Sequence, residues 1–282
     1  MRHESIEILL DQIIEEYKYK PVDLLNINDG PGEYQYISNL KRTYLRTLND
    51  LSSFPRSTSA QVKVLEIGAY LGVVSIALSR LGYAVTAADI PQYMKNIRLH
   101  EKFHQNGVDV ITLDLGDYII PVESSSFNVV VMCETLEHLN FNPLPVFAEI
   151  NRILVKGGCL YISLPNLAAL VNRVKLLSGR SIHNPISDFA AQLEQNNNMI
   201  VGIHWREYTK DELLELLARE DFSVTRHYFF TSTKSHPLAQ LLYAIFPQLR
   251  PNQTAIAIKM SEISQKGLLS PNVSSKVPDC DY

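Results

Sequence analysis

The segment at residues 62–72, VKVLEIGAYLG, constrains the fold of this chain more than any other part of the sequence. It has the pattern of a buried strand that runs into a glycine-bearing turn and then into a helix. Gly68 allows the backbone to turn sharply and to approach a ligand, and the helix that follows offers free N–H groups at its start. This arrangement predicts a nucleotide-binding site at the edge of an α/β sheet.

Strand and helix patterns alternate downstream of this unit. Short apolar and often β-branched runs are separated by helical patterns, as parallel βαβ units require. The expected strands cover residues 62–67, 84–88, 108–112, 127–132, 159–164, 222–230 and 254–259. The sequence therefore predicts an α/β fold with a doubly wound, seven-stranded sheet.

Helical patterns surround this alternation. Residues 5–17 have apolar side chains at helical spacing, and a second helix is expected at residues 37–51, after a loop at residues 21–31. Thr209 and Glu212 form the pattern of a capping box that opens a further helix. The apolar segment 238–246 is expected in the core or at a dimer contact rather than as a membrane anchor. The expected organisation is an N-terminal helical cap (1–55), a main domain (56–262) with an insert near 166–206, and a disordered tail (263–282).

The spacing of the glycines excludes two kinds of nucleotide site. Gly68 and Gly72 form G-x-x-x-G, which differs from the G-x-G-x-x-G pattern of a pyrophosphate binder. The turn also lacks the phosphate-binding lysine of a P-loop. Glu66, just before the turn, would repel a pyrophosphate but suit a cationic ligand such as a sulfonium or an ammonium group.

Acidic residues follow the next two strands. Asp89 ends the second strand, where a carboxylate accepts hydrogen bonds from both hydroxyls of a ribose. Asp114 follows the third strand, where a carboxylate can accept from an adenine amino group. Each residue alone could equally be a loop cap. Because both stand in register with the glycine turn, they favour an adenosine site.

Residues 62–164 resemble the class I S-adenosylmethionine-dependent methyltransferases. The resemblance rests on EIGAYLG (66–72), Asp89, Asp114-Leu115 and FNVVVMCETLEHL (127–139). Tyr70 stands where the family usually has a glycine, and Asn128 where it usually has an aspartate. The resemblance implies strand order 3-2-1-4-5-7-6 with strand seven antiparallel, and S-adenosyl-L-methionine as the cofactor. The implied cofactor-binding residues are Glu66, Gly68, Tyr70, Gly72, Asp89, Ile90, Asp114, Leu115 and Glu134.

Two carboxylates and an imidazole follow the fourth strand. If a helix begins there, Glu134, Glu137 and His138 share one face, because they are three and four residues apart. With His204 from the insert they could bind Mg²⁺ or another divalent cation. The ubiquinone-biosynthesis O-methyltransferases and the ribose methyltransferases of small-RNA 3′ ends, which the chain resembles here, have the same pattern, implicated in metal binding.

Two other interpretations of this cluster stay open. His138 or His204 could act as a catalytic base without a metal, since histidine titrates near neutral pH. Alternatively, Glu137 caps a helix and His138 is a wall of the cofactor pocket. A base or a metal favours a hydroxyl acceptor over nitrogen or carbon, because a neutral hydroxyl is a poor nucleophile.

The insert indicates what kind of acceptor to expect. Residues 166–206 resemble methyltransferases of bacterial polysaccharide and glycolipid synthesis, which implies a small-molecule, glycan or lipid-linked acceptor. Within the insert, residues 167–180 combine apolar spacing with Arg173, Lys175 and Arg180. This pattern is typical of a lid helix over the active site, or of a basic helix that rests on a membrane surface.

Composition limits the other function classes. The chain has 282 residues and a net charge of −4, which does not indicate a nucleic-acid partner. An RNA ribose methyltransferase remains an alternative, as does an inactive cofactor-binding scaffold in which Tyr70 closes the pocket. The glycine spacing disfavours a nicotinamide-dependent reductase. Cys133, Cys159 and Cys280 share no close spacing and the N-terminus has no signal-peptide pattern, so we expect a cytoplasmic protein, with peripheral membrane contact as one option.

Overall fold

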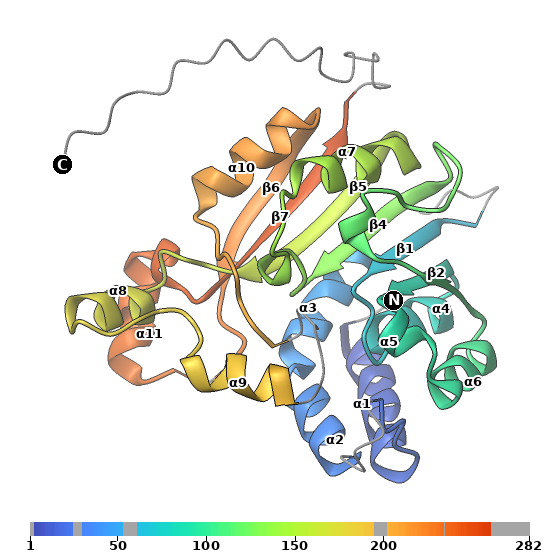
Figure 1. Cartoon of the computed structure of the whole chain (residues 1–282), viewed down its shortest axis with the longest axis horizontal. Helices are drawn as coiled ribbons and strands as arrows, with labels where there is room; N and C mark the ends of the chain where they lie inside the picture. The colour runs from blue at the N-terminus through green and yellow to red at the C-terminus, as the bar shows by residue number, and fades with distance from the viewer. Residues whose placement is uncertain (1–2, 25–29, 53–60, 195–201, 234, 261–282) are drawn as a thin grey trace.

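The computed structural model describes residues 3–24, 30–52, 61–194, 202–233 and 235–260. The tail expected at residues 263–282 lies outside these ranges. The strands are β1 (Lys63–Ile67), β2 (Ala84–Asp89), β3 (Val108–Thr112), β4 (Phe127–Cys133), β5 (Leu154–Pro165), β6 (Phe222–Phe230) and β7 (Asn252–Lys259). They form one seven-stranded sheet in the order β3-β2-β1-β4-β5-β7-β6 (Figure 1). This order confirms the fold class that the sequence predicts.

The sheet is mixed, with one antiparallel strand. The strands β1 to β5 pair in parallel, and β7 runs antiparallel to both β5 and β6. The central strands are rich in valine and isoleucine and buried on both faces, as a parallel sheet covered by helices requires. Their carboxyl ends therefore meet at one edge, where ligands of such sheets bind.

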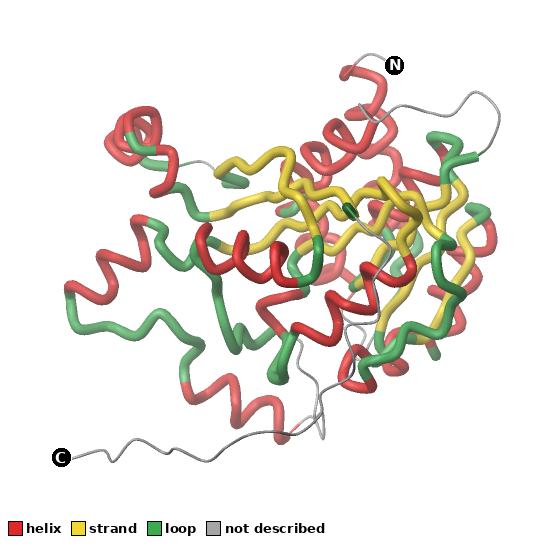
Figure 2. Tube along the Cα trace, turned by 90° about the horizontal axis from the view of Figure 1, so that it is seen from above, coloured by secondary structure: helices red, strands yellow, loops and turns green. Residues whose placement is uncertain are grey.

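Helices cover both faces of the sheet, and each face has its own buried core (Figures 1 and 2). The first face carries α1 (His3–Tyr19), α2 (Gly30–Asn39), α3 (Lys41–Ser52), α4 (Val73–Arg80), α5 (Pro91–Met94) and α6 (Ile97–Gln105). The second face carries α7 (Leu144–Ile153) and α10 (Lys210–Arg219). The N-terminal helices share their core with the sheet: Tyr17 of α1 donates a hydrogen bond to the carbonyl of Leu71.

Three further helices are α8 (Leu170–Leu177) and α11 (Pro237–Ile245), which lie at the left of Figure 1, and α9 (Ile186–Glu194), which lies at the bottom of that view. None of the α11 side chains is buried, so the expectation that residues 238–246 lie in the core is wrong. Within the described residues, no helix combines the length and the apolar character needed to cross a membrane.

Several boundaries differ from the sequence prediction. The helix expected at residues 37–51 is two helices that meet at Leu40, and the first begins at Gly30, inside the expected loop. Part of the insert forms the helix α9, which is absent from the helices that the sequence predicts. Strand β5 begins at Leu154 rather than at residue 159, and its register against β4 shifts between Phe127 and Val129. The capping box of Thr209 and Glu212 is confirmed, with both reciprocal hydrogen bonds present.

Candidate active site

A cavity of about 430 Å³ opens at the carboxyl edge of the sheet. Its wall includes a residue at or directly after the end of each of β1, β2, β3 and β4. Seven of the sequence-predicted cofactor residues line it: Gly68, Tyr70, Asp89, Ile90, Asp114, Leu115 and Glu134. Two predicted residues, Glu66 and Gly72, are absent from its wall. The position agrees with the crevice in which doubly wound sheets bind nucleotides.

The glycine turn between β1 and α4 has a left-handed backbone at two glycines. Gly68 has φ +76°, and a Cβ there would overlap the Thr135 side chain. Gly72 has φ +72°, and a Cβ there would overlap the Phe103 ring of α6. A glycine is therefore required at position 72 because α6 packs closely against the start of α4, and not because the residue contacts a ligand.

Glu66 does not have the position that the sequence predicts. Its side chain is buried and accepts a hydrogen bond from the Ser75 hydroxyl of α4. Burial raises the pKa of this carboxyl to about 8, although the bond from Ser75 opposes the shift. Because the group is mostly protonated near neutral pH and lies outside the cavity wall, it does not supply the negative charge expected to face a cationic ligand.

Asp89 lines the cavity at the end of β2. Its Oδ2 accepts the N–H of Tyr70 at 2.6 Å, and its Oδ1 accepts the N–H of Ile90 at 2.7 Å. These bonds fix the carboxylate and leave each oxygen a further lone pair. Burial raises the pKa of Asp89 to about 6, and the two backbone bonds limit that rise. The carboxylate is thus able to accept two ligand hydroxyls.

Asp114 caps a turn and also lines the cavity. Its Oδ1 accepts the N–H of Gly116 at 2.9 Å, which caps the 3₁₀ turn Leu115–Asp117. The same residue and Leu115 line the cavity. The cap holds the carboxylate at the cavity edge without using all of its acceptor sites.

Three tyrosines line one side of the cavity. Tyr70 has φ +48°, a left-handed conformation that costs a non-glycine residue about 1–2 kcal/mol. Its ring packs edge-on against Tyr36 at 5.4 Å and Tyr93 at 5.3 Å between ring centroids. These contacts hold Tyr70 in the wall, and the cavity stays open beside it. Tyr36 comes from α2, and no local pattern in the sequence indicates that it reaches the site.

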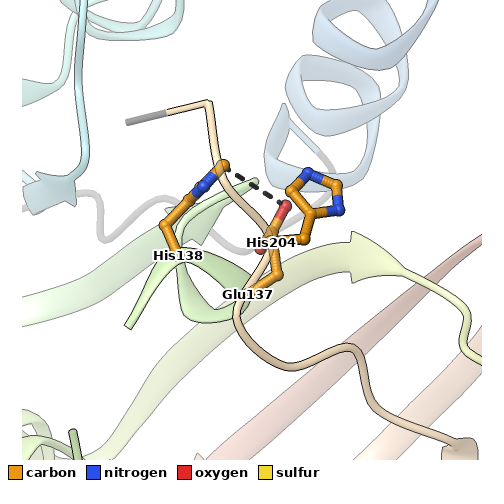
Figure 3. Close-up of side chains that lie close together, drawn as sticks. All are labelled: Glu137, His138 and His204. Atoms are coloured by element: carbon orange, nitrogen blue, oxygen red, sulfur yellow. Dashed lines mark ion pairs between the residues drawn. The ribbon is translucent and has the colours of Figure 1, made fainter. Parts of the chain in front are cut away.

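Glu137, His138 and His204 form a cluster at the same cavity (Figure 3). One ligand atom from each lies within 4.8 Å of the others, and the two imidazole centroids are 5.0 Å apart. Glu137 is fully buried, and neither of its carboxylate oxygens has a hydrogen-bond partner. His138 Nε2 lies 4.0 Å from Glu137 Oε1. This arrangement brings together three of the four residues predicted to bind a metal.

Glu134 lines the cavity but is not part of this cluster. The sequence argument assumed an α-helix from Glu134, whereas the chain forms only the 3₁₀ turn Leu136–His138. Glu134 itself has φ +49°, and its N–H donates to the Ser163 carbonyl at 2.8 Å, which prolongs the pairing of β4 with β5. Its side chain therefore does not share a helical face with Glu137.

Backbone contacts bring the insert to the 3₁₀ turn. The N–H of Trp205 donates to the Glu137 carbonyl at 2.8 Å. His138 Nδ1 lies 2.9 Å from the Ile203 carbonyl, which can only accept, so Nδ1 carries the proton. The other ring nitrogen, His138 Nε2, lies on the side of Glu137.

A polar chain orients His204 in a similar way. His204 Nδ1 lies 3.1 Å from Glu207 Oε1, and Glu207 Oε2 accepts the side-chain amide of Asn172 at 2.9 Å. Burial tends to raise the pKa of Glu207, but the bonds from His204 and Asn172 hold it below its usual value. The ionised carboxylate therefore fixes the His204 ring. Sequence reasoning missed Glu207, although it lies only three residues after His204.

Burial makes the ionised forms of Glu134 and Glu137 unfavourable. Burial, together with the nearby Glu134 charge, raises the pKa of Glu137 well above its usual value. Burial also raises the pKa of Glu134 to about 7. A buried carboxylate without a hydrogen-bond partner is stabilised by a proton or by a bound cation.

Comparison with known sequences assigns the family. The profile described as a methyltransferase domain matches residues 36–227, which is more than half of the chain. The chain belongs to this family of methyltransferases. The family and fold imply S-adenosylmethionine as the cofactor, in agreement with the cavity that Asp89 and Asp114 line.

Curated relatives match only part of this methyltransferase. A ubiquinone biosynthesis O-methyltransferase of Xanthomonas campestris is 34% identical over 105 residues, which are 37% of this chain and 43% of that protein. One from Xanthomonas oryzae is 33% identical over 140 residues, 49% of this chain and 54% of that protein. The matched part is about half the length of these relatives.

Solved structures share the fold. An S-adenosylmethionine-dependent methyltransferase from Mesorhizobium loti has a TM-score of 0.53 at 14% identity, over 78% of this chain and 97% of that one. One from Thermotoga maritima has a TM-score of 0.51 at 15% identity, over 81% and 95%. At this identity the likeness concerns the fold alone.

Proposed function

We propose that this methyltransferase transfers a methyl group to a hydroxyl of a small molecule or of a glycan or lipid-linked precursor. The observation that carries the proposal is the cluster of Glu137, His138 and His204 in the wall of the cofactor cavity. A hydroxyl must lose its proton to react, and this cluster offers groups that accept a proton or bind a cation. The partial likeness to ubiquinone biosynthesis O-methyltransferases also supports this choice of acceptor.

The residues around the cavity fit the cofactor. Asp89 would accept the ribose hydroxyls, and Asp114 would accept from the adenine amino group. Gly68 and Thr135 both line the cavity, and a side chain at Gly68 would overlap that of Thr135, so the glycine allows this close packing in the wall. S-Adenosylmethionine supplies a methyl group that its sulfonium already activates. The protein must therefore position the acceptor and remove its proton.

The two histidines are suited to the second task. Because the Ile203 carbonyl accepts from His138 Nδ1, His138 Nε2 is the ring nitrogen that would accept a proton from the acceptor hydroxyl. Glu207 stabilises the positive charge that His204 would gain on protonation. Either imidazole could thus act as the base for a hydroxyl at this wall.

The same residues form a plausible ligand set for a divalent cation. Glu137 has two buried oxygens without hydrogen-bond partners, and both histidines are oriented through Nδ1, as metal-binding histidines commonly are. One carboxylate and two imidazoles suit Mn²⁺, Zn²⁺ or Fe²⁺ better than Mg²⁺, which prefers oxygen ligands. A cation there would lower the pKa of an acceptor hydroxyl and orient it.

The test begins with calorimetric titrations of the purified protein. We expect S-adenosylmethionine to bind, and Mn²⁺ or Zn²⁺ to bind more tightly than Mg²⁺. Glu137→Gln should abolish the heat of metal binding and leave cofactor binding intact. Release of S-adenosylhomocysteine is then measured with phenolic and sugar hydroxyl acceptors and with matched amines. Turnover of amines alone would overturn the hydroxyl proposal, and unchanged metal binding in Glu137→Gln would overturn the metal site.

A further inference from the structure

Large apolar side chains are exposed at the end of the molecule formed by α8 and α11 (Figure 1). They include Leu177, which is 88% exposed, and Leu241 and Ile245, each 59% exposed. The full set is Val171, Val174, Leu176, Leu177, Leu238, Leu241, Ile245 and Phe246. Scattered apolar side chains on a surface need no explanation, but a concentration on two helices marks an interaction site.

Hydrogen bonds tie the two helical segments together. The side-chain amide of Asn166, just before α8, donates to the carbonyls of Gln248 at 2.9 Å and Arg250 at 2.8 Å. Both acceptors follow α11, and the N–H of Asn166 also donates to the Pro251 carbonyl at 2.7 Å. Asn166 is buried, so these bonds fix the segment that leads into α8 to the segment that follows α11.

The segments that contain α8 and α11 carry basic residues but no acidic ones. Residues 166–187 and 231–260 contain no aspartate or glutamate, although the chain as a whole has 30 acidic residues. Arg173 and Arg180 are exposed beside the apolar side chains of α8, and Lys175 is half-buried there. A protein with a net charge of −4 thus has a local face that is apolar and positive.

Exposed apolar side chains next to basic ones fit some partners better than others. A second copy in a two-fold dimer would place two faces of the same positive charge against each other, with no acidic residue from either segment to pair with the basic ones, and like charges repel. An anionic membrane surface instead accepts apolar side chains at the acyl boundary and attracts arginine and lysine through its head groups. We propose that α8 and α11 dock this methyltransferase reversibly on a membrane surface that contains anionic lipids.

The orientation of α8 is compatible with such docking. Its buried residue, Asn172, faces inward and donates to Glu207, whereas Arg173, Val174 and Leu177 are exposed. No residue of α8 lines the cavity in this structure. The exposed side of α8 can therefore contact a membrane while Asn172, on its buried side, keeps its hydrogen bond to Glu207. The proposal does not depend on which acceptor the enzyme uses.

Co-sedimentation with lipid vesicles tests the proposal. The full chain should bind vesicles of phosphatidylcholine mixed with phosphatidylglycerol, and bind phosphatidylcholine alone much more weakly. Raising the salt from about 0.1 M to about 1 M shortens the Debye length from about 10 Å to about 3 Å, so partitioning should fall. No binding to the anionic vesicles, or equal binding to both kinds, would overturn the proposal.

Matched variants separate the two contributions to binding. Arg173→Gln with Arg180→Gln should weaken partitioning about fivefold for each basic residue removed. Leu241→Glu with Ile245→Glu should abolish it, because charge replaces two exposed apolar side chains. The controls are Arg219→Gln and Ile119→Glu, at exposed positions outside α8 and α11. Retained S-adenosylmethionine binding shows that each variant is folded.

Other occupants of the face give different results. If the controls weaken vesicle binding as much as the matched variants do, the surface is not the docking site. If the wild type forms dimers that the α11 variant dissociates, and does not bind vesicles, the face is a contact between two copies and the membrane proposal fails.

Discussion

Under the proposed function, Asp89 binds the ribose of the cofactor, and this role can be tested by substitution. Its two backbone bonds hold both oxygens at the cavity, where they can accept two ribose hydroxyls. Hydrogen bonds to a charged group contribute about 1.5–3 kcal/mol each, so Asp89→Ala should weaken S-adenosylmethionine binding at least about tenfold. Calorimetry measures the change, with Asp109→Ala on the exposed side of β3 as the control. Equal effects of the two substitutions would contradict a specific role for Asp89.

Glu207 is a positioning residue rather than one that contacts the acceptor. It holds His204 through Nδ1 and is itself held by Asn172. Under the proposed function, Glu207→Gln should lower the affinity for Mn²⁺ about 10–100-fold, because partners of metal-bound histidines have effects of that size. Affinity for S-adenosylmethionine should not change, which separates this role from a general loss of folding. The exposed residue Glu215, changed to Gln, is the control; a parallel loss of cofactor affinity would reject the positioning role.

Sequence reasoning identified site residues where they follow strands directly. Asp89 and Asp114 line the cavity as expected, because the carboxyl ends of parallel strands must meet at one edge. Glu134 also lines the cavity, but the expectation that it shares a helical face with Glu137 and His138 is wrong, because spacing alone does not distinguish an α-helix from a left-handed residue followed by a 3₁₀ turn. It could not find Tyr36, whose approach depends on how α2 packs against the glycine turn.

Among the helices and strands, those that depend on residues close together in sequence were predictable. The strands alternate with helices because of binary patterning, and α10 begins at a capping box that depends on only four residues. The two helices that meet at Leu40 were not predictable, because neither glycine nor proline marks the break. The Leu40 N–H donates to Tyr36 and its carbonyl accepts from Tyr44, so the helical bonding continues through the junction.

The start of α10 gives a quantitative test. Thr209 accepts the N–H of Glu212 with its side chain, and the Glu212 carboxylate accepts the N–H of Thr209. Thr209→Ala should reduce the free energy of unfolding by about 1 kcal/mol, since it removes one half of this cap. Urea denaturation measures the loss. Thr209→Ser keeps the hydroxyl and should remain within a few tenths of a kcal/mol of wild type; a similar loss in both variants would show that the methyl group matters instead.

At the scale of the whole molecule, exposure was the property that the sequence could not supply. The apolar composition of α11 matches that of a core helix, yet it lies at one end of the fold with none of its side chains buried. Conversely, Glu66 resembles a surface carboxylate in sequence but is buried between β1 and α4. The exposure of α11 and the burial of Glu66 depend on how elements distant in sequence pack together. Periodicity shows which side of an element is apolar, but not whether another element covers that side.

The buried carboxyls couple the stability of the whole fold to pH. Burial raises the pKa of Glu66 from an unfolded value near 4.5 to about 8, and that of Asp89 from near 3.8 to about 6. Between these values the folded state binds more protons than the unfolded state. The free energy of unfolding is therefore highest below about pH 4 as far as these two groups are concerned, and falls as the pH rises to about 8.

Glu66→Gln removes the larger of these two contributions. The amide is neutral at every pH and can still accept from Ser75, so the variant should lose much less stability than wild type between about pH 5 and pH 8. The difference should be on the order of a few kcal/mol. Urea denaturation of both proteins at several pH values measures it, with Glu123→Gln at an exposed loop position as the control. If the wild type and Glu66→Gln have parallel pH profiles, Glu66 is ionised in the folded protein at neutral pH and the protonated, buried state argued for it is wrong.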